Sequence, residues 1–298
     1  MKLELQDITK RFGDQEILHQ ISFDVVSGRA IGFLGRNGAG KTTTIRCLMD
    51  VFKPDSGQIL LDGSPFRARD YKIGYLPEER GLYAKEQLLH QLVYFAELRG
   101  MSAQAAKASA RYWLSRVDLS RYESKRLEVL SKGNQQKVQI IQALIHDPDI
   151  LILDEPFSGL DPVNSMVLKE IILEKIREDR LVIFSSHQMV YVEEFCDDIA
   201  LIDNGNIILR GNLKDIKRRQ GLGKLRLRAD IDEAGIVAAG ASVVSLDKEG
   251  WIVQPGAAQT KESFLNELLQ SGVDIQQFGD YEPSLTQVFI HEIGETNE

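Results

Sequence analysis

The stretch G-R-N-G-A-G-K-T at residues 35–42 decides the fold, because it matches the pattern G-x-x-x-x-G-K-[ST] of a phosphate-binding loop. The apolar run at 30–34 ahead of it predicts a buried strand, and residues 42–49 behind it predict a helix. In that order, backbone amides and the positive end of the helix converge on an anion, while Lys41 reaches the outer phosphates. The Thr42 hydroxyl can ligate Mg²⁺. A glycine-rich turn without a ligand is the alternative.

The residues predicted to contact the nucleotide in and after this loop are Gly35, Arg36, Asn37, Gly38, Ala39, Gly40, Lys41, Thr42 and Thr43.

The composition of the chain limits which class of protein can carry this loop. The 298 residues are 43% hydrophobic and 27% charged, which is ordinary for a soluble globular protein and long enough for two domains. The net charge of −8 argues against nucleic acid as the main partner. Two cysteines, Cys47 and Cys196, are too few for a disulfide framework and lie in segments with a helical pattern, so we expect buried, reduced thiols in a cytosolic protein. No segment approaches 18 consecutive apolar residues, so work on a membrane would need another polypeptide to span it.

The rest of the first two thirds of the chain predicts a parallel α/β sheet with two additions. Alternating residues up to 26 predict strands ahead of the loop, and residues from about 85 to 146 predict a helical subdomain. Strand signals at 150–153, 181–185 and 199–203 are separated by helical patterns at 164–179 and 188–196, which is typical of a parallel sheet.

The C-terminal part predicts a separate small domain. We expect domain boundaries at 1–213, a basic linker at 214–223 and an α+β accessory domain at 224–298. The order strand, helix, strand, strand, helix, strand, helix from residue 225 would be a ferredoxin-like unit. The basic residues of this region are Lys214, Lys217, Arg218, Arg219, Lys224, Arg226 and Arg228. They indicate either a solvated helix and linker or an anchor on anionic lipid head groups.

Two further segments carry candidate chemistry. The run at 150–155 ends in Asp154 and Glu155, and a buried strand would deliver both carboxylates to the edge of the sheet where ligands collect. Beside a phosphate loop, Asp154 suits the shell of a magnesium ion and Glu155 suits a base that orients or deprotonates water. Ser131 precedes a predicted helix, and with Gly133 it would make a second anion site or a simple helix cap.

Taken together, these segments resemble a known family. The loop at 35–42, the segment L-S-K-G-N at 130–134, the acids 154–155, the segment S-G-L-D at 158–161 and His187 occur in the order and spacing of ABC-type ATPases. Over about residues 1–213 the chain is similar to the nucleotide-binding subunit of an ABC transporter. The resemblance implies a homodimer, or a pair with a related ATPase subunit, that sandwiches ATP and Mg²⁺.

The resemblance also implies a role for each matching residue. Phe12 matches the aromatic that stacks on adenine, with a core aromatic as the alternative. Ser131 and Gly133 match the signature segment that contacts the γ-phosphate bound to the opposite subunit. Asp161 matches the aspartate that links the two sites across the dimer.

Two matches concern catalysis itself. Glu155 matches the catalytic base, and His187 matches the switch residue at the γ-phosphate, although a lone histidine after a strand is usually structural. Lys41 completes the predicted catalytic set, and Thr42, Glu78 and Asp154 are the predicted ligands of Mg²⁺.

The chain departs from the family pattern at two places. Lys132 and Asn134 replace the third and fifth residues of the usual L-S-G-G-Q, yet both side chains still donate hydrogen bonds. Glu78 stands where the family usually has a glutamine that contacts magnesium and the attacking water. A carboxylate can ligate magnesium but cannot donate as an amide does.

The C-terminal extension and the segment E-P-S-L-T-Q-V-F at 282–289 look like exporters of the sodium- or drug-extrusion type. The resemblance therefore implies an ATPase that powers export through a separate integral-membrane permease subunit, from a cytoplasmic position on the inner face of the cell membrane. A soluble regulatory ATPase and a nucleotide switch that does not hydrolyse ATP are the alternatives.

Overall fold

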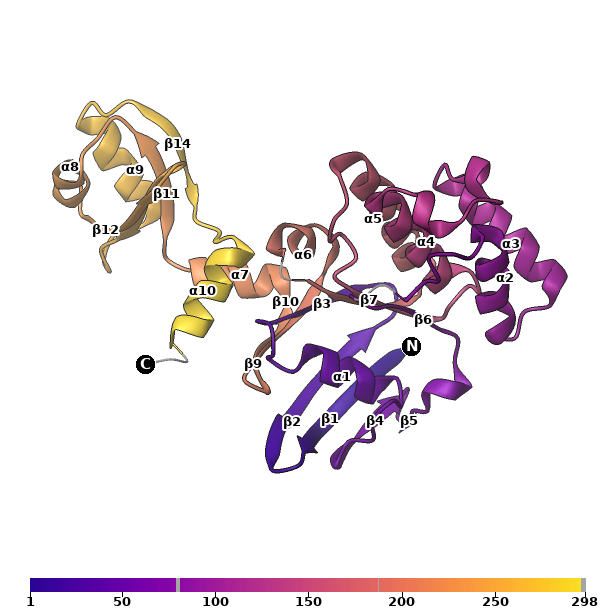
Figure 1. Cartoon of the computed structure of the whole chain (residues 1–298). Helices are drawn as coiled ribbons and strands as arrows, with labels where there is room; N and C mark the ends of the chain where they lie inside the picture. The colour runs from indigo at the N-terminus through magenta and orange to yellow at the C-terminus, as the bar shows by residue number, and fades with distance from the viewer. Residues whose placement is uncertain (79–80, 187, 296–298) are drawn as a thin grey trace. The chain divides into compact units, whose positions relative to one another are not determined.

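The computed structural model describes residues 1–78, 81–186 and 188–295, and it contains two compact units, Met1–Leu213 and Lys214–Glu298. Figure 1 shows the elements of each unit. No helix in these described ranges is long and apolar enough to cross a membrane.

A mostly parallel sheet forms the centre of the first unit, with strand order β10-β9-β3-β8-β7-β6 among the described residues. The strands are β3 (Ala30–Leu34), β6 (Ile73–Leu76), β7 (Ile150–Asp154), β8 (Leu181–Ser185), β9 (Asp198–Asp203) and β10 (Asn206–Asn212). Every residue of β3, β7 and β8 is buried, as expected for parallel strands covered on both faces. The predicted parallel core is confirmed, and β10 adds an antiparallel edge through the hairpin at Asn204 and Gly205.

A second, antiparallel sheet packs on one face of this core. Its strand order is β2-β1-β4-β5, with β1 (Lys2–Phe12), β2 (Gln15–Val26), β4 (Ser56–Leu61) and β5 (Ser64–Pro65). Leu3, Leu5 and Ile21 join Ile45 of α1 (Lys41–Leu48) and Ile152 of β7 in one apolar core. In Figure 1 this sheet and α1 lie on one side of the parallel sheet, and α4, α5 and α6 lie on the other.

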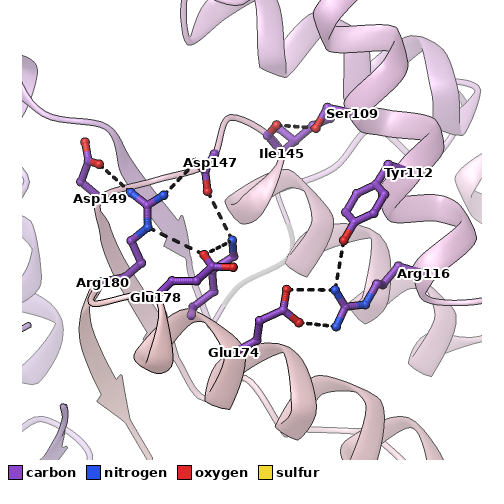
Figure 2. Close-up of polar contacts among 10 residues, drawn as sticks. Ser109, Tyr112, Arg116, Ile145, Asp147, Asp149, Glu174, Glu178 and Arg180 are labelled. Carbon is purple, nitrogen blue, oxygen red and sulfur yellow. Dashed lines mark hydrogen bonds and ion pairs between the residues drawn. The ribbon is translucent and has the colours of Figure 1, made fainter. Parts of the chain in front are cut away.

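The predicted helical subdomain consists mainly of α2 (Leu88–Leu98), α3 (Ala103–Arg116) and α4 (Lys132–Leu144). Figure 2 shows how it joins α5 (Pro162–Arg177) of the core. The Arg116 guanidinium makes a two-pronged ion pair with Glu174, and its Nη1 also donates to the Tyr112 hydroxyl at 3.1 Å. The Ser109 hydroxyl donates to the Ile145 carbonyl at 2.6 Å. The ion pair holds α3 against α5 of the core, and the Ser109 hydrogen bond joins α3 to the end of α4 within the subdomain.

Both cysteines are buried and free, as predicted. Cys47 lies in α1, and burial raises the pKa of its thiol to about 11. Cys196 lies one residue beyond α6 (Met189–Phe195), so the helix is shorter than its sequence pattern suggested.

The second unit has the predicted ferredoxin-like order. The elements are β11 (Leu225–Ala229), α8 (Glu233–Ala238), β12 (Ala241–Asp247), β13 (Gly250–Pro255), α9 (Lys261–Gln270) and β14 (Ile275–Asp280). They are followed by α10 (Leu285–Glu295). The strands pair antiparallel in the order β12-β13-β11-β14, and Leu227, Val253, Phe264 and Leu268 fill the core under the helices. Most of the segment predicted as a linker is a helix, α7 (Leu213–Gly221), because Leu213 and Ile216 are buried on one side of it.

The Arg116–Glu174 pair makes a pH-dependent contribution to stability that a double-mutant cycle can measure. The hydrogen bonds that Glu174 accepts from Arg116 hold the pKa of Glu174 below its usual value. The contribution is therefore present above that usual pKa and is lost as pH falls through the lower folded pKa. We expect a coupling free energy of about 1 kcal/mol at neutral pH, the upper end for a partly exposed pair, because the pair is bidentate.

The cycle compares Arg116→Ala, Glu174→Ala and the double variant by urea unfolding at neutral and acidic pH. A coupling energy that stays constant across this range would contradict the assignment.

Candidate active site

The phosphate loop joins the end of β3 to the start of α1, and its glycines are required by its geometry. A Cβ on Gly35 would lie 2.4 Å from the carbonyl oxygen of Ile202 in β9, closer than real Cβ atoms approach. Gly38 and Gly40 have φ of 82° and 115°, a region that residues with side chains rarely adopt. The loop is thereby packed against β9 without side chains, and an anion can approach its backbone.

Lys41 begins α1 and turns back over the loop. Its Nζ donates to the carbonyl oxygens of Gly35 at 2.6 Å and Arg36 at 3.1 Å, and the residue is only 9% exposed. Burial lowers the pKa of Lys41, while the charges of Glu155 and Asp154 oppose that shift. The structure therefore brings the predicted lysine and the two predicted acids into one site.

The acids lie at the end of β7, beside β8. Asp154 pairs in register with Ser185, and the Glu155 amide donates to the Ser185 carbonyl at 2.9 Å. Glu155 has a φ of 50°, so the backbone turns sharply immediately after the strand. Its Oε2 accepts a hydrogen bond from the Ser186 hydroxyl at 3.2 Å, which fixes the carboxylate.

The environment of Asp154 suits a bound cation. Asp154 and Glu155 are 3% and 6% exposed, and burial raises the pKa of Asp154, with Glu78 and Glu155 adding to the rise. A divalent ion would offset this concentration of negative charge, and the donors are oxygens, which Mg²⁺ prefers. Glu78 follows β6 by two residues and is exposed, and Thr42 is exposed in the first turn of α1. The predicted metal ligands Thr42, Glu78 and Asp154 thus fit Mg²⁺ by donor type.

Phe12 lies at the end of β1 and is 44% exposed. Its ring packs edge to face on Phe52, with centroids 5.1 Å apart. The Lys10 ammonium lies 5.5 Å from the Phe12 centroid. Phe12 is thus a surface aromatic, and stacking on adenine stays a prediction.

The predicted signature residues gather at a different place, against α5. Ser131 is the N-cap of α4, and its hydroxyl accepts from the Asn134 amide at 3.3 Å. Asp161 caps α5 by accepting from the Asn164 amide at 2.9 Å, and a Cβ on Gly133 would lie 3.3 Å from Asn164 Nδ2. Among the described residues, no hydrogen bond or ion pair joins Ser131 or Gly133 to the phosphate loop. One chain therefore assembles the loop with the acids, and separately the signature turn with Asp161.

His187 lies outside the described residues, so its predicted role stays a prediction. Sequence reasoning missed its neighbour Ser186, which is buried and positions Glu155. The position of Ser186, directly after β8 at the same sheet edge, was the available signal. Asn164 was also missed, because its contact with Asp161 is a local helix cap that a sequence pattern does not distinguish from an ordinary one.

Comparisons with known proteins identify relatives along the whole chain. Residues 18–158 match the family model described as ABC transporter, and residues 211–293 match the one described as ATP-binding protein DrrA1-3-like, C-terminal domain. The uncharacterized ABC transporter ATP-binding protein YhaQ of Bacillus subtilis is 39% identical over 99% of this chain and 100% of its own length. The Nod factor export ATP-binding protein I of Burkholderia lata is 34% identical over 70% of each chain.

A solved structure of the ATP binding subunit of an ABC transporter superposes with a TM-score of 0.68 at 31% identity. It covers 74% of this chain, and this chain covers 94% of it.

We predict that Gly35→Ala will damage the loop through its contact with β9. The new Cβ would collide with a backbone atom that cannot move without shifting the strand, so we expect a loss of about 1–3 kcal/mol in the free energy of unfolding. Nucleotide affinity should fall with it. Gly279→Ala is the matched control, because a Cβ there meets nothing within 4 Å. Equal unfolding free energies for the two variants would contradict the close approach.

Proposed function

The chain belongs to the ATP-binding proteins of ABC transporters and is an ATPase, and from this premise we propose how its own residues bind and hydrolyse ATP. The observation that carries the proposal is the convergence of Lys41, Asp154 and Glu155 in one buried site. Isolated buried charges are costly, so three of them together indicate a site built for a charged ligand.

In the proposed mechanism, the amides of the phosphate loop and the Lys41 ammonium hold the β- and γ-phosphates of ATP. Lys41 would exchange its bonds to the Gly35 and Arg36 carbonyls for the phosphate oxygens. Glu155 orients the attacking water and accepts its proton, while Ser186 keeps the carboxylate in place. Thr42, Asp154 and Glu78 would hold Mg²⁺, and the ion would neutralise part of the negative charge of the phosphates.

We propose that a second copy completes the site. Ser131 is exposed at the positive N-terminal end of α4, where a helix attracts phosphate, yet it is not joined to the loop of its own chain. In a two-fold symmetric dimer, each loop faces the partner's signature turn, and the Asp161 turn lies next to both. ATP then bridges the halves, and hydrolysis removes that bridge. A related ATPase subunit could take the place of the second copy.

We further propose that a membrane subunit docks beside the helical subdomain, which would place this subunit on the cytoplasmic face of the membrane. Two adjoining hollows of about 660 and 360 Å³ share Ile73 and Arg99. Tyr75, Phe95 and Leu98 form part of the lining of the smaller hollow. Half of the residues that line the larger one are cations, namely Lys53, Arg67, Arg69 and Arg99. Because Ile73 and Tyr75 belong to β6, which ends two residues before Glu78, a partner here would be linked mechanically to the site.

The direction of transport that we propose is export, and two comparisons support it. The C-terminal unit matches the DrrA1-3-like C-terminal domain, and a relative over the ATPase unit is named for export of Nod factor. We propose that this subunit powers export, as the sequence resemblance implied.

The test of the proposed site is Glu155→Gln. The amide keeps the size of the side chain but cannot accept a proton, so we expect hydrolysis to fall by at least about 10²-fold while ATP binding remains. ATP should then convert the variant from monomer to a lasting dimer, measured by light scattering after gel filtration. Lys41→Ala serves as the comparison, because it should fail to bind ATP and stay monomeric. Full turnover in purified Glu155→Gln would remove the assignment of the base.

Ser186→Ala tests how Glu155 is positioned. Losing one hydrogen bond to a charged group costs about 1.5 kcal/mol, so we expect kcat to fall about tenfold with KM unchanged. Ser271→Ala is the control, since Ser271 follows α9 in the second unit and its hydroxyl donates to the Glu267 carbonyl of that helix. An unchanged kcat for Ser186→Ala would show that the hydrogen bond from Ser186 to Glu155 does not contribute to catalysis.

A further inference from the structure

The cations of the second unit include two groups with different surroundings. One group holds the unit together. Lys217 Nζ pairs with Glu282 at 3.0 Å, and Arg226 makes two hydrogen bonds to Asp247 at 2.7 and 3.0 Å. The Arg226 guanidinium also lies 5.3 Å from the centroid of the buried Tyr281 ring. Both cations therefore bind to other residues of the second unit.

The other group surrounds a hollow. Lys214 and Arg218 lie one turn apart on α7, Lys224 lies just before β11, and Lys261 is the first residue of α9. All four line a hollow of about 740 Å³ whose other walls are the turn at 221–223, the loop at 255–257 and residues 280–282. Three separate elements therefore bring cations to one place.

The charge of this hollow contrasts with that of its unit. Residues 214–298 contain nine lysines and arginines against fourteen aspartates and glutamates, yet four of those nine cations line this one hollow. The two carboxylates of the lining already have partners: Asp280 pairs with Lys261 at 2.8 Å, and Glu282 pairs with Lys217, which lies outside the lining. The lining thus holds four cations and two carboxylates.

The shape of the hollow also suits a ligand. Gly221 allows the turn to approach Tyr281, because a Cβ there would lie 2.1 Å from the Tyr281 carbonyl oxygen. Gln259 and Lys261 stand on either side of the Thr260 N-cap of α9 and both line the hollow, so the hollow lies beside the first turn of this ten-residue helix. A volume of about 740 Å³ lies within the range of small-molecule sites and is much larger than a single inorganic anion needs.

We infer that this hollow is a second anion site, separate from the nucleotide site, that binds a phosphate-bearing molecule. Lysine and arginine from several elements, a helix N-terminus and a glycine turn are the groups that recognise phosphate in proteins. The phosphate could belong to the head group of an anionic lipid or to a soluble organic phosphate. Occupancy would tie α7 to α9 and to the turn before β11, and so would make the second unit responsive to that ligand.

The experiment uses the full chain with its phosphate loop filled by a non-hydrolysable ATP analogue, so that only the second site is available. In one arm, the protein is sedimented with vesicles of phosphatidylcholine alone or of phosphatidylcholine and phosphatidylglycerol in equal parts. In the other arm, inorganic pyrophosphate is titrated into the protein in a calorimeter. Binding to the mixed vesicles identifies the lipid source, and binding of pyrophosphate identifies a soluble one.

The test variant is Arg218→Gln with Lys224→Gln, and the matched control is Arg219→Gln with Lys248→Gln, which removes two cations of the same unit that lie outside the hollow. Each cation near an anionic surface contributes about fivefold in affinity, so the test variant should bind at least about tenfold more weakly while the control keeps its affinity. Arg218→Gln alone, at an exposed position, should show an intermediate loss, and Arg218→Lys should restore binding. Equal unfolding temperatures would show that each variant is folded.

Binding of neither probe by the unmodified protein would overturn the inference. So would an equal loss of binding in the test and control variants, which would indicate attraction to the general charge of the surface.

Discussion

The structure depends on the burial of three charges at one edge of the parallel sheet. Lys41, Asp154 and Glu155 are each less than a tenth exposed, and a single ionised group so placed would be strongly destabilising. They are tolerated because β3, β8 and β7 are adjacent and parallel, so the loop after β3 and the acids after β7 reach the same edge. Every residue of these three strands is buried, and their burial on both faces fixes the register that brings the charges together.

The same constraint underlies the proposal that one chain provides only part of the site. The phosphate loop and the acids lie at the ends of strands of the core, whereas Ser131 caps α4 of the helical subdomain, where the neighbouring Gly133 lies beside Asn164 of the Asp161 turn. The signature turn is therefore carried by a different part of the fold from the charges it would complement. A ligand that needs both must bring two surfaces together, and its binding energy can then drive association.

The sequence predicts features that depend on interactions between neighbouring residues, and it does not predict those that depend on contacts between distant segments. The strand at 181–185 was predicted with its observed bounds, because a run of apolar residues between a charged residue and a serine pair leaves little choice. Most of helix α7 was predicted as a linker, because its many charged residues are typical of an exposed segment. Leu213 and Ile216 are nevertheless buried. The Arg116–Glu174 pair joins residues 58 positions apart, so no local sequence pattern predicts it. Ser186 lay within reach of sequence reasoning, because it follows a predicted strand at the edge where the acids were placed.

Helix α5 shows how the two halves of the first unit can act together. It begins at Asp161, beside the signature turn, and near its other end Glu174 is bound to Arg116 of α3. A helix of 16 residues is about 24 Å long and behaves as a rigid rod over that length. A partner that displaces the Asp161 turn must therefore either move α3 as well or break a two-pronged ion pair. Since Gly133 of α4 also lies beside Asn164, a movement of α5 would be transmitted to both α3 and α4.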